Sequence, residues 1–140
     1  MARKILIVED DASIRESLID LLEAEDYQVL VAENGTVGLR LARAQLPDLI
    51  VCDIMMPDLD GYSVLAELQN APATSTIPFI FLTAKADRID QRRGMGLGAD
   101  DYLTKPFTRT DILQAIDARL AKRHEIDRRH EEDMTALRDS

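Results

Sequence analysis

Leu49-Ile50-Val51-Cys52-Asp53 is a run of apolar residues that ends in a carboxylate. The run does not alternate with polar residues, it contains β-branched side chains, and it is too short for a buried helix. This pattern is typical of a parallel β-strand covered on both faces. Residues 5–8 and 79–82 have the same pattern, and weaker strand signals lie at 29–32 and 102–103. The sequence therefore predicts five strands, with Asp53 directly after the apolar part of the third.

Helical patterns separate the predicted strands. Ser13 and Glu16 predict a capping box for the first helix, and Pro47 predicts the end of the second. A third helix is predicted from Gly61 to Leu68. Strands that alternate with helices favour the α/β class, as a doubly wound, open parallel sheet of five βα units.

Two further helices are predicted in the last third of the chain. Asp87 is the predicted cap of the fourth, and three glycines crowd its end, so we expect this helix to be marginally stable. Thr108 and Asp111 predict the start of the fifth, which has an apolar stripe at residues 112, 116 and 120.

Polar side chains follow four of the strands at their carboxyl ends, where ligands bind in such sheets. They are Glu9, Asp10, Asp11, Asp53, Thr83 and Lys105. Packed carboxylates repel one another unless a cation is present, and oxygen ligands suit Mg²⁺, with Mn²⁺ as an alternative. A carboxylate nucleophile beside a cation, a hydroxyl and a lysine indicates phosphoryl transfer. Asp11 has the simpler interpretation of a helix cap, and Cys52 that of a small buried hydrophobic residue.

Composition excludes several classes of protein. The formal net charge of −9 argues against DNA, RNA or an anionic membrane as a direct partner of this segment. The single cysteine cannot form an internal disulfide, and the apolar run near the N-terminus is too short for a signal peptide or a membrane span. We therefore expect a cytoplasmic protein.

Four motifs together resemble the CheY-like receiver domain of two-component response regulators. They are ILIVEDD at residues 5–11, DIMMPDLDG at 53–61, Thr83-Ala84, and GADDYLTKPF at 98–107. The resemblance covers residues 3–121. It implies a flavodoxin-like fold with strand order 2-1-3-4-5, an order that the residues alone do not determine.

The resemblance also implies a role for each residue of the site. Asp53 would be the phosphoacceptor, and the Mg²⁺ ligands would be Glu9, Asp10, Asp53 and the backbone carbonyl of Met55. Thr83, the Ala84 backbone and Lys105 would bind the phosphoryl group. Thr83 and Tyr102 would form the switch, although Tyr102 could also be an ordinary half-buried strand tyrosine. Met55 and Lys85 would tune hydrolysis of the phosphoaspartate.

The implied function is a switch rather than an enzyme, since its only chemistry would be on itself. A sensor histidine kinase or a histidine phosphotransfer protein would supply the phosphoryl group. The surface formed by the fourth helix, fifth strand and fifth helix would then change to control an output. A phosphorylation-independent docking module is the alternative. An aspartyl-nucleophile phosphatase is disfavoured, because Met55 occupies the position where such enzymes have a second aspartate.

Two features bear on assembly. The same surface is a candidate homodimer interface, yet Ala115 stands where the subfamily with winged-helix outputs usually has arginine, and Gln91 replaces a basic residue. We expect the receiver domain to span residues 1–121. Residues 122–140 contain five basic and six acidic side chains and no glycine or proline, which predicts a charged helical extension and a second candidate dimer seam. An output module is expected after Ser140.

Overall fold

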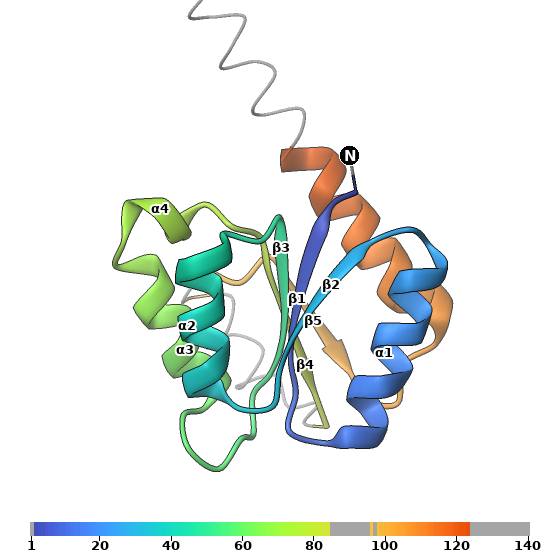
Figure 1. The fold of residues 1–140 in the computed structure, drawn as a ribbon, viewed down its shortest axis with the longest axis horizontal. Coiled ribbons are helices and arrows are strands. Elements are labelled where there is room, and N and C mark those ends of the chain that lie inside the picture. Colours follow the sequence, from blue (N-terminus) through green and yellow to red (C-terminus); the bar gives the residue numbers. More distant parts are fainter. Residues whose placement is uncertain (1, 85–95, 97, 124–140) are drawn as a thin grey trace, which may run out of the picture.

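The computed structural model describes residues 2–84, 96 and 98–123. Five parallel strands form one sheet in the order β2-β1-β3-β4-β5 (Figure 1). The α/β class and the strand order are therefore confirmed. The strands are β1 (Lys4–Val8), β2 (Gln28–Ala32), β3 (Leu49–Asp53), β4 (Phe79–Thr83) and β5 (Asp101–Thr104).

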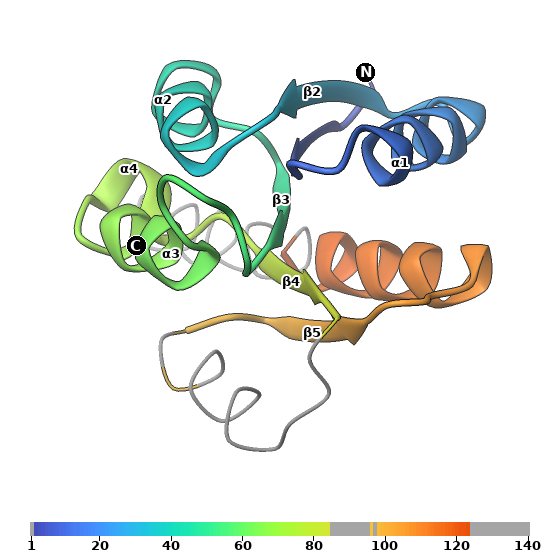
Figure 2. The ribbon, with the colours of Figure 1, turned by 90° about the horizontal axis from the view of Figure 1, so that it is seen from below.

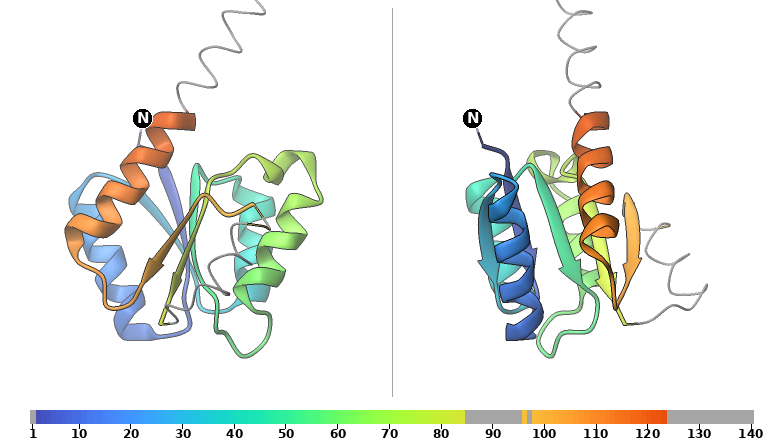
Figure 3. Two further views of the ribbon diagram at one scale, coloured as in Figure 1. Left: turned by 180° about the vertical axis from the view of Figure 1, so that it is seen from behind. Right: turned by 90° about the vertical axis from the view of Figure 1, so that its right-hand side faces the viewer.

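Helices cover both faces of the sheet. They are α1 (Ala12–Ala24), α2 (Gly35–Gln45), α3 (Gly61–Gln69), the short α4 (Pro72–Ser75), and a C-terminal helix described over 109–123. Figure 2 shows α1 and the C-terminal helix on one face, with α2, α3 and α4 on the other. The two views of Figure 3 show the same arrangement, with β5 at the edge of the sheet.

The strands alternate their side chains between two apolar cores. In β1, Ile5 and Ile7 pack with the α1 side of the sheet, whereas Leu6 and Val8 pack with the α2 and α3 side. All residues of β3 and β4 are buried, as a strand covered on both faces requires. Each such aliphatic side chain contributes roughly 1.5–3 kcal/mol by its removal from water. The sheet is therefore a rigid base for the groups at the carboxyl ends of its strands.

One predicted helix cap is wrong and two are confirmed. Asp11, not Ser13, caps α1, because its carboxylate accepts hydrogen bonds from the backbone N–H groups of Ser13 and Ile14. A charged acceptor that serves two N–H groups also complements the positive end of the helix dipole. At the C-terminal helix, the backbone N–H groups of Thr108 and Asp111 donate reciprocally to each other's side chains, at 3.2 and 3.0 Å.

The ends of the remaining helices are close to those predicted. The second helix ends at Gln45 and is followed by Leu46 in the left-handed region (φ 46°), just before Pro47. The four-residue α4 was not predicted. The helix predicted at Asp87 lies outside the described residues, as does most of the predicted extension 122–140. No helix of the described ranges is long and apolar enough to cross a bilayer.

Candidate functional site

Three carboxylates meet at the carboxyl ends of the adjacent strands β1 and β3. Carboxylate oxygens of Glu9, Asp10 and Asp53 all lie within 4.8 Å of one another. Glu9 and Asp53 are buried, with 1% and 6% of their surfaces exposed, whereas Asp10 is exposed. The strand order reverses between these two strands, so this is the point where α/β sheets form their binding crevice.

Lys105 reaches the carboxylates from the loop after β5. Its Nζ donates to Glu9 Oε1 at 2.5 Å and to Asp53 Oδ2 at 3.3 Å. The backbone N–H of Lys105 donates to the carbonyl of Thr83 at 2.7 Å, which fixes this loop beside the end of β4. One ammonium group therefore bridges two buried carboxylates. Hydrogen bonds between charged groups of this kind are stronger than those between neutral groups.

Burial and neighbouring charges perturb the proton affinities of this cluster. Burial, followed by the adjacent Asp53 carboxylate, raises the pKa of Glu9 to about 8, although the hydrogen bond and charge of Lys105 oppose the rise. Burial alone would lower the pKa of Lys105, but its hydrogen bond to Glu9 and the charges of Asp53 and Glu9 outweigh burial and raise it. The raised pKa of Glu9 therefore reflects burial and a neighbouring carboxylate whose effects Lys105 offsets only in part.

The residues of the site fit a divalent cation. Glu9 Oε2 is a buried oxygen that makes no hydrogen bond within the described part of the chain. An oxygen of this kind is costly unless it is paired, and a cation would pair it. Mg²⁺ prefers oxygen ligands and keeps several of its bound water molecules. The exposed position of Asp10 leaves the cluster open to that water. The backbone carbonyl of Met55 lies in the loop that follows β3, two residues after Asp53. The Met55 side chain is 57% exposed.

The remaining predicted site residues lie at the ends of β4 and β5. Thr83 is the last residue of β4 and is fully buried, and Ala84 after it is exposed. Tyr102 in β5 is half-buried, and its ring lies edge-to-face with that of Phe81 at a centroid distance of 6.4 Å. Lys85 lies outside the described residues. Buried Cys52 belongs to the apolar core on the α3 side, where burial raises the pKa of its thiol.

Three residues that hold the loops of the site were not among the predicted site residues. Arg15 donates from Nη1 to the carbonyls of Glu9 and Asp10, at 2.9 and 3.4 Å. Asp58, in the loop after β3, accepts from the backbone N–H groups of Gly35 and Thr36 at the start of α2. A positive charge in the first turn of a helix is unfavourable, because it opposes the helix dipole. The position of Arg15 in the first turn of α1 could therefore have indicated a role for this side chain outside the helix.

Gly61 is the third residue of this kind. It is the first residue of α3 and donates its backbone N–H to Ile54 O at 2.9 Å. A Cβ atom there would lie 2.4 Å from the carbonyl oxygen of Asp53. Only glycine allows α3 to begin so close to the backbone of this strand end.

The sequence of this chain is similar to those of one known family. A family model described as the response regulator receiver domain matches residues 5–117. Protein PilH of Pseudomonas aeruginosa is 44% identical over 121 residues, which cover 86% of this chain and 99% of PilH. The DNA-binding response regulator MtrA of Mycobacterium tuberculosis is 38% identical over 122 residues, which cover 87% of this chain and 52% of MtrA. The chain thus spans about half the length of some curated relatives and nearly the whole of another.

A solved structure adds a similarity in three dimensions. The receiver domain of the sensor histidine kinase PA1611 from Pseudomonas aeruginosa superimposes with a TM-score of 0.80 at 30% identity, and the match covers 86% of this chain and 99% of that one. That crystal structure contains a magnesium ion coordinated in its active-site cleft.

Proposed function

The chain belongs to the response regulator receiver domain family of two-component signalling, and from that premise we propose that it accepts a phosphoryl group on Asp53. The observation that carries this proposal is the cluster at the ends of β1 and β3. Asp53 is a buried carboxylate within 4.8 Å of two others, and an ammonium group lies 3.3 Å from it. A helix cap or a surface aspartate would need none of these neighbours.

The proposed reaction is displacement at phosphorus. A carboxylate oxygen of Asp53 attacks the phosphoryl group of a phosphohistidine, the P–N bond breaks with its electrons passing to the imidazole nitrogen, and an acyl phosphate forms on Asp53. The donor is a sensor histidine kinase or a histidine phosphotransfer protein. Lys105 moves from its carboxylate partners to a phosphoryl oxygen, with the Ala84 backbone N–H and the Thr83 hydroxyl as the other donors.

The same carboxylates would hold the cofactor. Glu9, Asp10, Asp53 and the backbone carbonyl of Met55 are the groups that would bind Mg²⁺, or Mn²⁺ in its place. The bound cation would neutralise charge on the phosphoryl oxygens. The chain's own contribution is to fix these oxygens at the edge of a rigid sheet, so that little reorganisation is needed when the phosphoryl group arrives.

The consequence of phosphorylation is proposed to pass from Thr83 to Tyr102. The Thr83 hydroxyl would turn toward the phosphoryl group, and the ring of Tyr102 would move toward the space that it leaves. Thr83 and Tyr102 lie on adjacent strands, since the register of β4 and β5 aligns Phe81 with Tyr102 and Thr83 with Thr104. The surface of β5 and the C-terminal helix would change as a result.

Met55 is proposed to slow the loss of the phosphoryl group by shielding it from water. Its side chain is now 57% exposed, so it is free to cover a group bound at Asp53. We expect the phosphoaspartate to be longer-lived in wild type than in Met55→Asn, measured by intact mass after removal of the donor. Equal lifetimes would contradict this role.

A homodimer through β5 and the C-terminal helix also stays a prediction. Ala115 is only 7% exposed on that helix, and Asp101 already lies 3.7 Å from Arg119 of the same chain. Fewer charged side chains on this surface would therefore be available for ion pairs between subunits. Analytical ultracentrifugation of chains that end at residues 121 and 140 tests the contribution of the tail, because the same oligomeric state in both would exclude a dimer seam in it.

The decisive experiment is intact mass spectrometry after incubation with acetyl phosphate and Mg²⁺. We expect one added phosphoryl group in wild type and in Asp20→Asn, a matched change at an exposed position of α1, and none in Asp53→Asn. An adduct that persists in Asp53→Asn would overturn the assignment. No adduct in wild type would favour the phosphorylation-independent docking module.

A further inference from the structure

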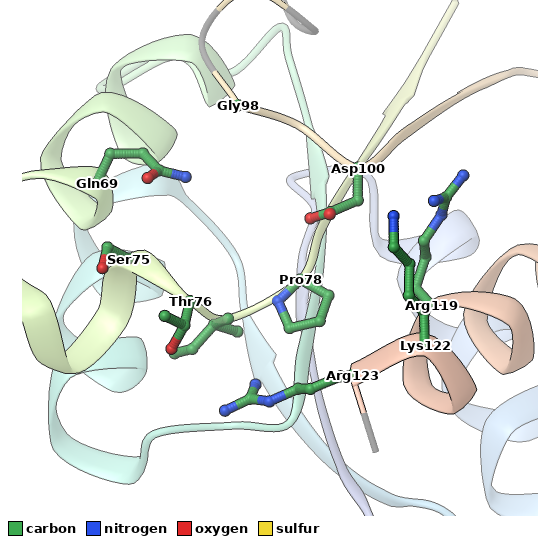
Figure 4. Close-up of a pocket in the computed structure, with 10 residues that line it drawn as sticks. Gln69, Ser75, Thr76, Pro78, Gly98, Asp100, Arg119, Lys122 and Arg123 are labelled. Atoms are coloured by element: carbon green, nitrogen blue, oxygen red, sulfur yellow. The ribbon is translucent and has the colours of Figure 1, made fainter. Parts of the chain in front are cut away.

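A polar cavity lies at the opposite end of the sheet from Asp53. It has a volume of about 410 Å³ and is bordered by the end of α3, the turn before β4, the turn before β5 and the C-terminal helix (Figure 4). Pro78 and Asp100, which line it, precede the first residues of β4 and β5. At about 3.3 Å per residue, β4 separates this cavity from Thr83 by roughly 15 Å.

The charge of the cavity differs from that of the chain. Three cationic side chains of the C-terminal helix line it, Arg119, Lys122 and Arg123, although the formal net charge of the protein is −9. Asp100 is the one acidic side chain among the described residues of the lining, and its Oδ2 already accepts a hydrogen bond from the Phe79 N–H at 2.8 Å. A hollow with an excess of one sign of charge concentrates ions of the opposite sign.

The cations lie in two groups. Figure 4 shows Arg123 extending beneath Pro78 toward Thr76, whereas Arg119 and Lys122 extend together on the side of Asp100. Positions 119, 122 and 123 are three and four residues apart, so the helix presents them on one side. An anionic ligand would therefore meet positive charge at two separate places.

Within the described chain, Arg119 has an unsatisfied donor, whereas Arg123 already donates from Nη1 to the carbonyl of Asp48 at 3.2 Å, which fixes its positive charge at this side of the cavity. Arg119 Nε is buried and makes no hydrogen bond among the described residues, and its Nη2 lies 3.7 Å from Asp101 Oδ2. A buried donor of this kind is costly unless a partner satisfies it. Arginine donates in a planar fork that matches phosphate and carboxylate oxygens, and lysine adds a point charge. Gln69 adds an amide to the opposite wall.

From these features we infer that the cavity binds a small organic molecule with two separated anionic groups, either phosphate or carboxylate. One group would be held by Arg123, and the other by Lys122 with Arg119. The ligand would connect the C-terminal helix with the turns before β4 and β5. This inference is independent of the proposed phosphorylation of Asp53, since it uses none of the same side chains.

The test is a titration followed by amide NMR, in a metal-free buffer of constant ionic strength. The probes are propane-1,3-bisphosphonate, glutarate as the dicarboxylate, and methylphosphonate with only one anionic group. We expect at least one of the two-headed probes to shift the amide signals of Thr76, Gly98 and Asp100, with an affinity roughly tenfold above that of methylphosphonate. The better of the two identifies the anionic group that the cavity prefers.

A charge-matched pair of variants localises the binding. Lys122 is exposed, so Lys122→Gln should fold normally and weaken binding roughly fivefold, whereas Arg40→Gln, an equal change of charge on the exposed face of α2, should leave it unchanged. Equal losses in the two variants would overturn the site and indicate non-specific attraction. Shifts confined to residues 9, 10 and 53, or no shift with either two-headed probe, would also overturn it.

Discussion

Gly61→Ala tests whether close approach of α3 to the end of β3 is essential. The added methyl group would lie 2.4 Å from the carbonyl oxygen of Asp53 and 2.9 Å from the Cα of Ile54, where ordinary contact begins at 3.4 Å. Both neighbours are backbone atoms, so no side-chain rotation can relieve the overlap. The start of α3 would have to move away from β3 by about 1 Å.

The expected cost is large for a single methyl group. Overpacking of a well-packed interior typically costs 1–3 kcal/mol, and backbone on both sides places this change near the upper end, at about 3 kcal/mol of the free energy of unfolding. The hydrogen bond from Gly61 N–H to Ile54 O, now 2.9 Å long, would lengthen with the same movement. A domain of this size would lose roughly 10 °C in Tm and stay folded at room temperature.

The assay is urea denaturation followed by circular dichroism, with linear extrapolation to water. Gly96→Ala is the matched control, because a Cβ atom there would have nothing within 4 Å. That change should alter stability by less than about 1 kcal/mol and should tend to increase it. Phosphorylation of Gly61→Ala by acetyl phosphate should also be slower, since the backbone of Asp53 is displaced. A loss below about 0.5 kcal/mol in Gly61→Ala would refute the reasoning.

Four further substitutions probe other parts of the molecule. Ile116→Ala, at a fully buried position, should cost about 2–5 kcal/mol in urea denaturation, whereas Leu46→Ala, at a position 50% exposed, should cost under about 1 kcal/mol; equal losses would contradict the assigned core. Tyr27→Phe removes an O–H that donates to Asp117 Oδ1 at 2.5 Å and should cost about 1 kcal/mol. Burial and Asp117 raise the pKa of Tyr27, so ultraviolet titration of wild type should show one tyrosine that ionises above the usual range. Hydrogen bonds from the Thr36 side chain and backbone lower the pKa of Asp58, so its contribution to stability is present above its unfolded pKa near 3.9 and is lost as the pH falls toward the folded value. Asp58→Asn should therefore be less stable than wild type at pH 6, by a margin that shrinks below about pH 4, and a margin independent of pH would contradict this role.

Much of the fold was predictable because local pattern and tertiary environment agree. The apolar runs at 5–8, 49–52 and 79–82 are buried strands, and the stripe of the C-terminal helix is buried at Ile112, Ile116 and Leu120. The strand order was not predictable from these patterns, since any order of five similar buried strands satisfies them. It came from the resemblance of the motifs to a known family.

The sequence predicted that the polar side chains of the site would lie close together, but it did not predict how they pair. The topological rule brings Glu9, Asp53 and Lys105 to one edge, because all three follow strands of a parallel sheet. That Lys105 would pair with Glu9 as well as Asp53 depends on loop geometry over 96 residues of sequence separation, which no local pattern encodes. The same limit applies to Asp58, whose partners at the start of α2 lie 22 and 23 residues away.

The position of β5 would explain how one sheet could be both a rigid base and the proposed switch. In β1, β3 and β4 nearly every residue is buried, and each of these strands has a neighbour on both sides, so their movement would break two ladders and two packed faces. In β5 all four residues are half-buried, and the strand pairs only with β4. Movement there disrupts one ladder and fewer buried contacts. We therefore expect a change at Asp53 to be expressed most easily through β5, which leads at one end to Lys105 and at the other to Asp100 in the cavity that Arg119, Lys122 and Arg123 line. Both β4 and β5 connect the two ends of the molecule, and β5 is the one of the two that is held by a single ladder and by fewer buried residues.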